Sequence, residues 1–391
     1  MTAESAVQFE ALQAKAQQIL QIFAAAGYER VAPAYIQPAD IFLSCIGEAL
    51  RNRTYVFTDP DGQELCLRPD LTVPAAHIYM ERNPQGGESA RYCYNGAAFR
   101  YQPIRGDAMR PREFRQTGLE YYGASDPEAA EVEVLALILE AVRASGLKGF
   151  QIHTGDLSLF CDLLNALPIP QRWRERLIHH FWRPGTFSAT LQNLARGLAT
   201  ISDPRIAELA TSLDSNDRLA AERQVADFLD RENITVLGAR NIGEIAERLL
   251  SAAADMREAP LSRDVIALVE SYLSISGPPA EALSAIEALT KEAGLSLDRA
   301  IASCQKRYKL MREADIDLGS LSFDADFGRN LEYYSGFVFQ LEIPGKGISG
   351  QIAGGGRYDG LLRSIGAGYD MPAVGSAIHT ERLLAATGGA G

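Results

Sequence analysis

The sequence predicts an α/β fold of the α+β type, in which helices flank an antiparallel sheet and a mainly helical insertion interrupts the chain. Three features support this prediction. Residues 92–101 and 114–122 form two strand-like runs joined by a long polar loop, and the second run alternates in residue type. Strand-like runs return after residue 320. Between these regions, residues 166–314 show helical spacing, punctuated by Gly and Pro.

The N-terminal part alternates between helix and strand patterns. Apolar residues recur every three or four positions over 9–26, which predicts a helix, and Gly27 is placed to end it. A hairpin with Asp61 and Gly62 at its turn is expected next. The other elements expected here are a strand entered at 28–33, a helix from about Thr72, a helix over 128–144, a strand over 150–156 and a helix over 157–167.

The C-terminal part is expected to complete the sheet. Residues 321–327 alternate in polarity, and a second strand is expected at 333–343. A third, 348–356, ends in three glycines, which let a ligand or another backbone approach closely. A last strand at 373–378 precedes a short helix near Glu381.

Composition argues against several classes of protein. The 391 residues are 47% hydrophobic, enough for one large core or two moderate ones, yet no run of some eighteen apolar residues suggests a membrane span. The N-terminus shows no secretory signal, so we expect a cytoplasmic protein. A formal net charge of −12 argues against binding of tRNA, which requires a basic surface.

Cysteine and histidine usage gives no indication of a metal site. Five scattered cysteines without a Cys-x-x-Cys pair are typical of thiols in a reducing compartment. His179 and His180 are adjacent, and neighbours on a helix point about 100° apart, so we interpret them as packing or surface residues. We expect neither a metal nor a cofactor.

The two strand-like runs and their loop carry the residues best suited to bind a ligand. Gln116, Gly118 and Glu120 share one face of the second strand, where the amide and carboxylate can hold a cationic amine or an imidazole. The loop is rich in arginines that suit a polyphosphate. These are Arg100, Arg105, Arg110, Arg112 and Arg115. The alternative is a solvated hairpin with scattered arginines.

The same stretch, from Phe99 and Arg100 through 110–116 to Glu120, resembles the second signature motif of class II aminoacyl-tRNA synthetases in its histidyl form. Residues 327–339 are similar to the histidine-specific segment of that family, and 353–362 with 372–383 are similar to its Gly-Gly-Arg-Tyr-Asp segment and third motif. The resemblance implies a class II catalytic-type domain made of residues 1–165 and 315–391, with 166–314 as the insertion. Pro33 matches the first motif, a dimer interface in the family, only loosely.

The resemblance also implies a histidine pocket without assigning any catalytic residue. Its members would be Asp70, Thr72, Arg100, Gln116, Glu120, Arg329, Tyr333, Tyr334 and Tyr358. Asp70 stands where the family has a glutamate, so it would accept from the ligand's amine in a shifted geometry; alternatively, it only caps the helix beginning near Thr72. The alternatives for the tyrosines and Arg329 are core aromatics and an ordinary ion pair.

Several departures from the synthetase pattern concern nucleotide and tRNA. The chain ends soon after the third motif, so no anticodon-binding domain is expected. Gln102 and Asn330 replace a Glu and a Gly of the family pattern, and His379 with Thr380 replaces a Gly-Leu pair. A histidine at 379 would fill part of the adenosine pocket. Arg110 and Arg382 are then vestigial nucleotide contacts.

A retained histidine pocket beside an eroded nucleotide site resembles the regulatory subunits of ATP phosphoribosyltransferase, the first enzyme of histidine biosynthesis. The resemblance implies a non-catalytic subunit, dimeric within a hetero-oligomer, that activates a short catalytic subunit and gives allosteric feedback control by L-histidine. One alternative is an enzyme that adenylates histidine without acting on tRNA, because Arg100 and Arg382 are retained. Another is a histidine-binding module for a different partner.

Overall fold

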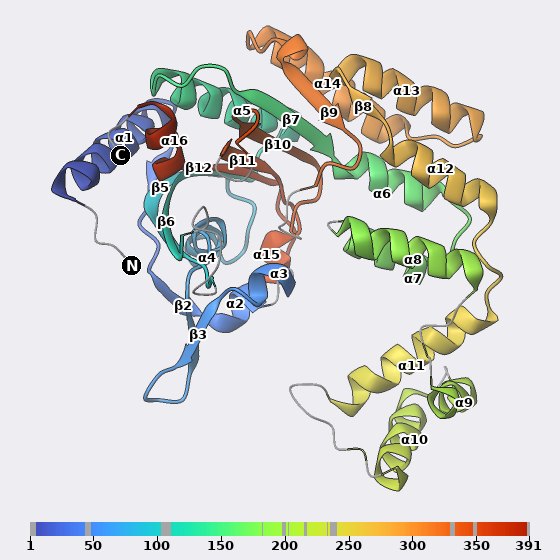
Figure 1. Ribbon diagram of the computed structural model, residues 1–391. Helices are drawn as coiled ribbons and strands as arrows, with labels where there is room; N and C mark the ends of the chain where they lie inside the picture. Colours follow the sequence, from blue (N-terminus) through green and yellow to red (C-terminus); the bar gives the residue numbers. More distant parts are fainter. Residues whose placement is uncertain are drawn as a thin grey trace. The chain divides into compact units, whose positions relative to one another are not determined.

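The computed structural model describes residues 5–43, 48–102, 111–181, 183–197, 201, 203–214, 217–232, 234, 241–328, 333–346 and 350–388. The chain forms two compact units (Figure 1). The first contains Met1–Ala166 and Tyr272–Gly391, and the second contains Leu167–Ser271.

A nine-stranded sheet forms the centre of the first unit. Its strand order is β1-β5-β6-β12-β11-β10-β7-β9-β8. In that order the strands are Glu29–Arg30, Ala90–Phe99, Glu113–Tyr122, Ala373–His379, Gln351–Arg357, Phe337–Glu342, Gln151–Asp156, Leu321–Asp324 and Ser276–Gly277. Only the pairs β1–β5 and β7–β9 are parallel among the strands described. The predicted antiparallel sheet flanked by helices is therefore confirmed.

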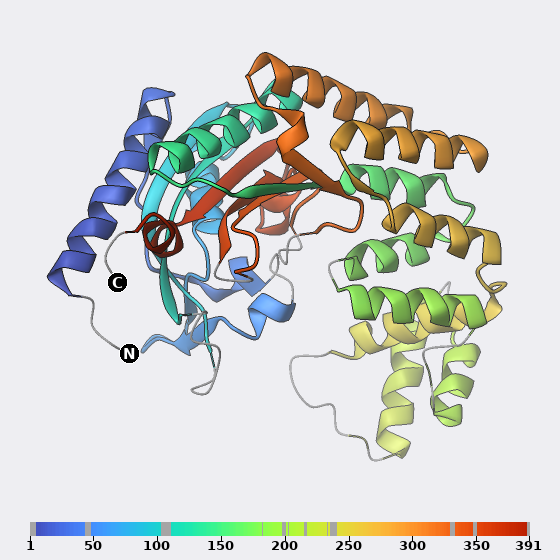
Figure 2. The same cartoon turned by 45° about the horizontal axis from the view of Figure 1, so that its top comes forward.

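Helices cover both faces of strands β5 and β6. Helix α1 (Ala6–Ala25) packs on α5 (Pro127–Ala144), and both contact the sheet, whereas α4 (Thr72–Arg82) lies within the curve of these strands (Figures 1 and 2). A capping box between Ser5 and Gln8 begins α1, and Gly27, at φ +88°, follows its end as expected. Asp126 caps α5 by accepting from the amide of Ala129. Helix α6 (Leu157–Ala166) follows β7, and the chain ends with α15 (Leu361–Ser364) and α16 (Thr380–Ala386) around β12.

A small second sheet of order β2-β4-β3 precedes α4. Its strands are Ile36–Pro38, Glu64–Leu67 and Tyr55–Thr58. The expected hairpin turn is present, with Gly62 at φ +85° and the side chain of Asp59 accepting from two turn amides. Short helices α2 (Ala39–Leu43) and α3 (Glu48–Arg51) connect β2 to β3.

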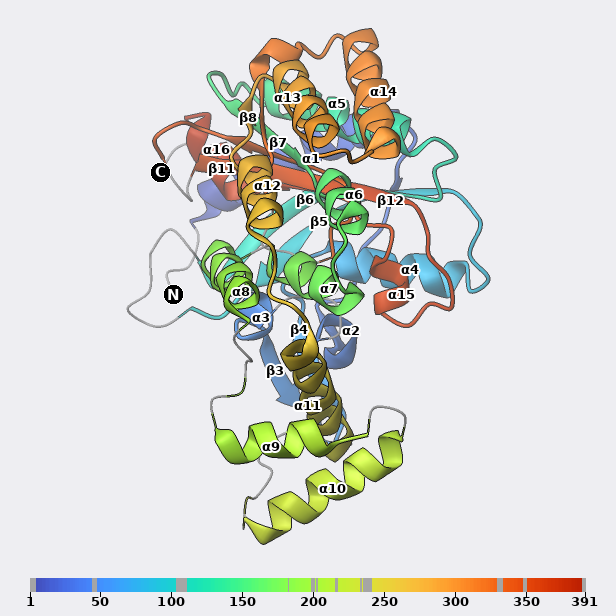
Figure 3. The same cartoon turned by 90° about the vertical axis from the view of Figure 1, so that its right-hand side faces the viewer.

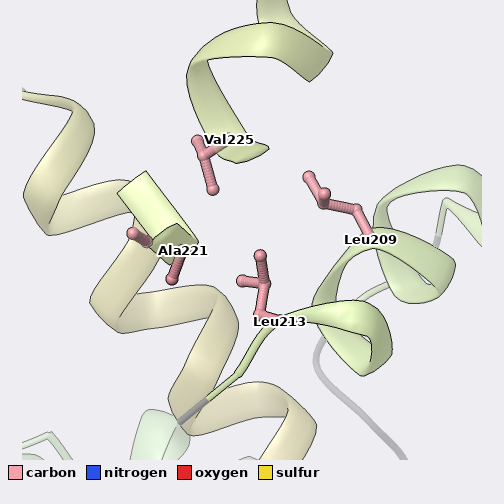
Figure 4. Packing of buried hydrophobic residues seen from close by; sticks show 5 residues of the cluster. Leu209, Leu213, Ala221 and Val225 are labelled. Atoms are coloured by element: carbon pink, nitrogen blue, oxygen red, sulfur yellow. The ribbon is translucent and has the colours of Figure 1, made fainter. Parts of the chain in front are cut away.

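The second unit is helical in its described residues. Its helices are α7 (Gln171–His180), α8 (Pro184–Arg196), α9 (Pro204–Ser212), α10 (Arg218–Arg231), α11 (Ile242–Arg257) and the first part of α12 (Arg263–Leu273). A small apolar core of leucine, valine and alanine side chains joins α9, α10 and α11 (Figure 4). His180 Nδ1 lies 2.7 Å from the hydroxyl of Thr190, and no cluster of three or more metal-binding side chains occurs in the described part of the chain.

The predicted insertion, 166–314, extends over both compact units. Helices α13 (Pro279–Glu292) and α14 (Asp298–Glu313) lie side by side and belong to the first unit, with α14 packed on α5 (Figure 3). A buried ion pair between Arg307 of α14 and Glu131 of α5 lies at this contact. None of the described helices combines the length and apolar character that a bilayer crossing requires.

Candidate functional site

Glu120 lies at the centre of the candidate site, on β6 between β5 and β12. Its side chain is fully buried, and its carboxylate accepts hydrogen bonds from the hydroxyls of Tyr94 (2.7 Å) and Tyr358. Burial raises the pKa of Glu120 to about 7, although hydrogen bonds from Tyr358, Tyr94 and Thr72 oppose this rise. At neutral pH the carboxyl group is thus poised between its two protonation states.

Two glycines create the space that Glu120 and Tyr94 occupy. Gly375 of β12 is directly opposite Glu120, and a Cβ atom there would collide with the Glu120 carboxylate. Gly118 is opposite Tyr94, and its Cβ would lie 2.7 Å from the tyrosine hydroxyl. Glycine at these positions is required by close approach of side chains rather than by backbone conformation.

Asp70 provides a second buried carboxylate at the start of α4. It is 2% exposed, and its Oδ1 accepts from the amide of Val73 at 3.2 Å. Its Oδ2 is buried and has no hydrogen-bond partner among the described residues. Burial raises the pKa of Asp70, and the positive charge of Arg100 opposes this. Asp70 thus accepts from an amide in the first turn of α4, although Leu71 is the N-cap residue, and this contact uses only one of its two oxygens.

Gln116 contributes another acceptor from the same face of β6 as Glu120. Its side chain is buried, and its Oε1 finds no donor in the described part of the chain. A buried acceptor without a donor is costly unless a ligand supplies one. Asp70 Oδ2 and Gln116 Oε1 therefore favour a ligand rich in N–H groups, such as an ammonium or an imidazole.

Three tyrosines line the site from the C-terminal part of the chain. The ring of Tyr333 lies 4.9 Å from that of Tyr334 and 5.6 Å from that of Tyr358, all three being largely buried. Burial, with the negative charges of Asp70 and Glu120 nearby, raises the pKa of Tyr333 well above its ordinary value. The structure thus brings Tyr333 beside both carboxylates.

The strand expected over 333–343 is shorter than predicted. Tyr333 and Tyr334 precede β10, which begins at Phe337. The carbonyl of Gly336 accepts from the amide of Leu157, at the point where β7 passes into α6. Tyr333 and Tyr334 therefore lie outside strand β10 and reach the pocket from the segment that precedes it.

The arginines expected at the site are held by the chain itself where they are described. Arg100 Nε donates to the carbonyl of Pro69 at 2.8 Å, and Arg382 Nη1 donates to the carbonyl of Gln351 at 3.0 Å. Arg110 and Arg329, expected at the nucleotide and histidine sites, lie outside the described residues.

His379, which was expected to fill part of an adenosine pocket, packs on an aromatic ring. The ring of His379 lies 5.2 Å from the ring of Phe114, and the Arg100 guanidinium lies 4.9 Å from the same ring. Phe114 is 6% exposed. His379 therefore packs against Phe114, the second residue of β6.

Two residues that support the site were not expected from the sequence. Tyr94 donates to Glu120, and Arg68, 2% exposed, donates to the carbonyls of Ala97 (2.7 Å) and Pro33 and lies over the ring of Tyr35. Arg68 fixes the segment leading to Asp70. In the observed pairing of β5 and β6, Tyr94 lies opposite Gly118. Aligning the two predicted strands in this register would have indicated that Tyr94 is close to Glu120.

Comparisons with known proteins show the family of the chain. The sequence matches the family model for histidyl-tRNA synthetase over residues 5–233 and 216–383. It is 33% identical to the ATP phosphoribosyltransferase regulatory subunit of Chelativorans sp. (strain BNC1), over 95% of this chain and 97% of the relative. Identity is also 33% to the protein of that name from Brucella anthropi, over 89% of this chain and 90% of the relative.

The fold also matches a solved structure. An ATP phosphoribosyltransferase regulatory subunit/histidyl-tRNA synthetase from Bacillus halodurans C aligns over 99% of this chain and 82% of its own, with a TM-score of 0.69 and 19% identity. At that identity the likeness concerns the fold alone. Together with the two relatives, these matches show that the chain belongs to the histidyl-tRNA synthetase-like family of ATP phosphoribosyltransferase regulatory subunits.

Proposed function

We propose that this chain is a non-catalytic regulatory subunit of ATP phosphoribosyltransferase, which a short catalytic subunit requires for activity and through which L-histidine controls the assembly. The names of its relatives support the role, and the Glu120 pocket supports the effector. The observation that carries the proposal is a buried site with two carboxyl groups, Asp70 and Glu120, and open acceptors. Four unpaired cysteines among the described residues support a reducing, cytoplasmic setting.

In this proposal the pocket recognises histidine through its nitrogen atoms. Asp70 Oδ2 and Gln116 Oε1 accept from the ammonium or imidazole N–H groups, and Glu120 balances the positive charge. Thr72 and the tyrosines 333, 334 and 358 exclude water and orient the ring. Binding of a cation favours the ionised forms of Asp70 and Glu120, whose pKa values burial has raised, so recognition is coupled to proton release. Arg329 remains part of the proposed site.

We propose that the chain catalyses no reaction of its own, because the residues expected to contact a nucleotide make contacts within the chain. Arg100 and Arg382, which the family uses for ATP, donate to backbone carbonyls of this chain, and His379 packs on Phe114. These contacts engage Nε of Arg100 and Nη1 of Arg382 and hold both side chains against the backbone of this chain. This arrangement supports a histidine sensor over an adenylating enzyme, and no tRNA-binding role is proposed.

We propose that the chain forms a dimer through one face of the small sheet of β2, β4 and β3. In the cross-strand register, Ile36, Leu67 and Tyr55 form one row, and Pro38, Leu65 and Phe57 form the next row on the same face. Ile36 is 52% exposed and Phe57 is 39% exposed. Exposed apolar faces of this kind mark association surfaces, so we assign this face to a second copy of the chain within the hetero-oligomer.

The test of the proposed role is reconstitution with a short-form ATP phosphoribosyltransferase catalytic subunit. We expect the two chains to co-purify, the phosphoribosyl transfer to ATP to rise on addition of this chain, and L-histidine to inhibit the assembled complex. A catalytic subunit that neither binds this chain nor changes in rate would contradict the proposal. ATP–pyrophosphate exchange dependent on histidine by this chain alone would favour the adenylating enzyme.

A further inference from the structure

A cluster of four charged side chains, three of them buried, lies outside the Glu120 pocket. Arg307 of α14 is 2% exposed and donates to Glu131 of α5 at 2.5 Å, and its Nη1 lies 2.8 Å from Asp156 of β7. Arg357 of β11 approaches the other oxygen of Glu131 at 3.6 Å. We call these four residues the Arg307 cluster. It joins two helices and two strands.

Both tyrosine-bearing segments of the pocket start at this cluster. Phe337, the first residue of β10, is paired with Asp156 in the sheet, and its ring lies 4.6 Å from the Arg307 guanidinium. Tyr333 and Tyr334 lie just before it in the chain. Tyr358, which donates to Glu120, directly follows Arg357. The positions of all three pocket tyrosines are therefore tied to the cluster through a few residues of backbone.

The two segments are also fixed to each other. The amide of Ser335 donates to the carbonyl of Arg357 at 2.8 Å, and the amide of Asp359 donates to the hydroxyl of Ser335 at 3.0 Å. Asp359 in turn accepts from Arg357 Nε at 2.7 Å. A displacement of Tyr358 cannot occur without moving Ser335 and Arg357.

Arg357 and Tyr358 contact opposite sides of the sheet. Consecutive residues in an extended chain point to opposite faces, so Tyr358 reaches Glu120 in the pocket while Arg357 reaches Glu131 on α5. This pair connects the pocket with helix α5. Helix α14, at the far end of the connection, belongs to the helical hairpin that directly follows the second compact unit in the chain.

We propose that Arg357 and Glu131 are positioning residues that transmit occupation of the Glu120 pocket to helix α14 through Arg307. The proposal rests on the proposed function, because it takes histidine as the ligand. Its physical basis is that Glu131 and Arg307 form a buried ion pair, and that a shift of the half-buried Arg357 changes the positive charge that faces Glu131 Oε1, an oxygen without a hydrogen-bond partner among the described residues. Coupling then needs a ligand that contacts Tyr358 and Glu120 differently in two arrangements.

The test combines calorimetry with hydrogen exchange on the intact chain, using L-histidine as the probe. In the wild type, histidine is expected to slow amide exchange both around Tyr358 and in α14. Arg357→Met removes the charge that reaches Glu131 but leaves the pair of Glu131 and Arg307 in place. We expect it to weaken histidine binding about fivefold or more, the usual lower range for coupled sites, and to abolish the effect on α14.

Two further variants separate coupling from general damage. Arg357→Lys retains a positive charge and is expected to restore part of the α14 response, which a variant with a merely damaged fold would not do. Lys306→Gln breaks an exposed contact between the same two helical regions, where Lys306 lies 2.7 Å from Asp126, and is expected to behave as wild type. Circular dichroism of each variant checks the fold.

The outcomes distinguish this inference from the proposed function. Histidine that binds the wild type without changing exchange in α14, or that still protects α14 in Arg357→Met, overturns the coupling and leaves the sensor intact. Histidine that does not bind the wild type at all overturns both. Equal loss of α14 protection in Lys306→Gln also overturns the specific role of Arg357.

Discussion

Gly375 of β12 faces Glu120 of β6 across the sheet, and the space that a Cβ atom would need at residue 375 is occupied by the Glu120 carboxylate. Because residue 375 has no Cβ atom, the carboxylate of Glu120 can lie against the neighbouring strand β12. The Tyr94 and Tyr358 hydroxyls then fix that carboxylate in the pocket.

Gly375→Ala is expected to displace Glu120 and abolish histidine binding. Because overpacking of a dense core also strains the fold, we expect a loss of about 1–3 kcal/mol in the free energy of unfolding. Gly360→Ala is the control, since residue 360 has φ −85° and its Cβ would meet no atom within 4 Å. Urea unfolding and histidine titration of both variants test this prediction. Unchanged histidine affinity in Gly375→Ala would show that the pocket does not need the space at residue 375.

The pKa of Glu120 predicts a pH dependence of stability. The folded-state pKa of about 7 lies above the ordinary value of 4.5, so the native state binds the proton more tightly than the unfolded chain. The resulting stabilisation is complete below pH 4.5 and is lost as the pH rises through about 7. At about 1.4 kcal/mol per pKa unit, its size is on the order of 3 kcal/mol.

Comparison with Glu120→Gln measures this contribution. Burial raises the pKa of Asp70 as well, and its charge acts on Glu120, so the difference between the two proteins contains the titration of Glu120 together with its coupling to Asp70. We expect the wild type to lose stability relative to the variant between pH 4.5 and 7, measured by urea unfolding at several pH values. Parallel profiles for the two proteins would mean that Glu120 does not titrate in this range.

His379 is expected to exclude nucleotide from the site. Its ring packs on Phe114, so His379→Gly should open that space and allow ATP to bind measurably, while the wild type gives no signal in the same titration. His77→Gly is the control, because that histidine belongs to α4 and pairs with Glu81. ATP binding by the wild type, or none by His379→Gly, would contradict the assignment of His379.

The apolar face of the small sheet is expected to hold a dimer together. Phe57→Lys should shift the chain toward a monomer in sedimentation velocity, because a charge would be buried against an apolar partner surface. Val56→Lys lies on the same strand but in the row of Gln37 and Cys66, which faces the other way, and should leave association unchanged. The proposal fails if both variants associate equally well.

The sequence predicted the elements whose signal is local. Helices α1 and α5 agree with the predicted ranges 9–26 and 128–144 to within a few residues, because apolar spacing and caps determine them. Gln116 and Glu120 were placed on one face by strand alternation, and both are buried in the structure. The resemblance supplied most of the remaining candidate pocket residues, and the structure places Asp70, Tyr333 and Tyr358 together with Glu120.

Other features depend on contacts between distant segments. The Arg307 cluster joins residues 131, 156, 307 and 357, and no local pattern distinguishes its members from solvated charges. Packing on α5 and α6 likewise places α14 in the first unit, although its sequence resembles the helices before it. Likewise, Arg100 and Arg382 look like phosphate ligands in the sequence, but backbone carbonyls of the folded chain accept from them.

The most direct test of the account is calorimetric titration of the isolated chain with L-histidine, repeated with Glu120→Ala and then with ATP. We predict that histidine binds the wild type, that the variant loses at least tenfold in affinity, about 1.4 kcal/mol, and that ATP gives no heat of binding. Circular dichroism would confirm that Glu120→Ala is folded. Absence of histidine binding to the wild type, or unchanged affinity in the variant, would contradict a histidine sensor built on the Glu120 pocket.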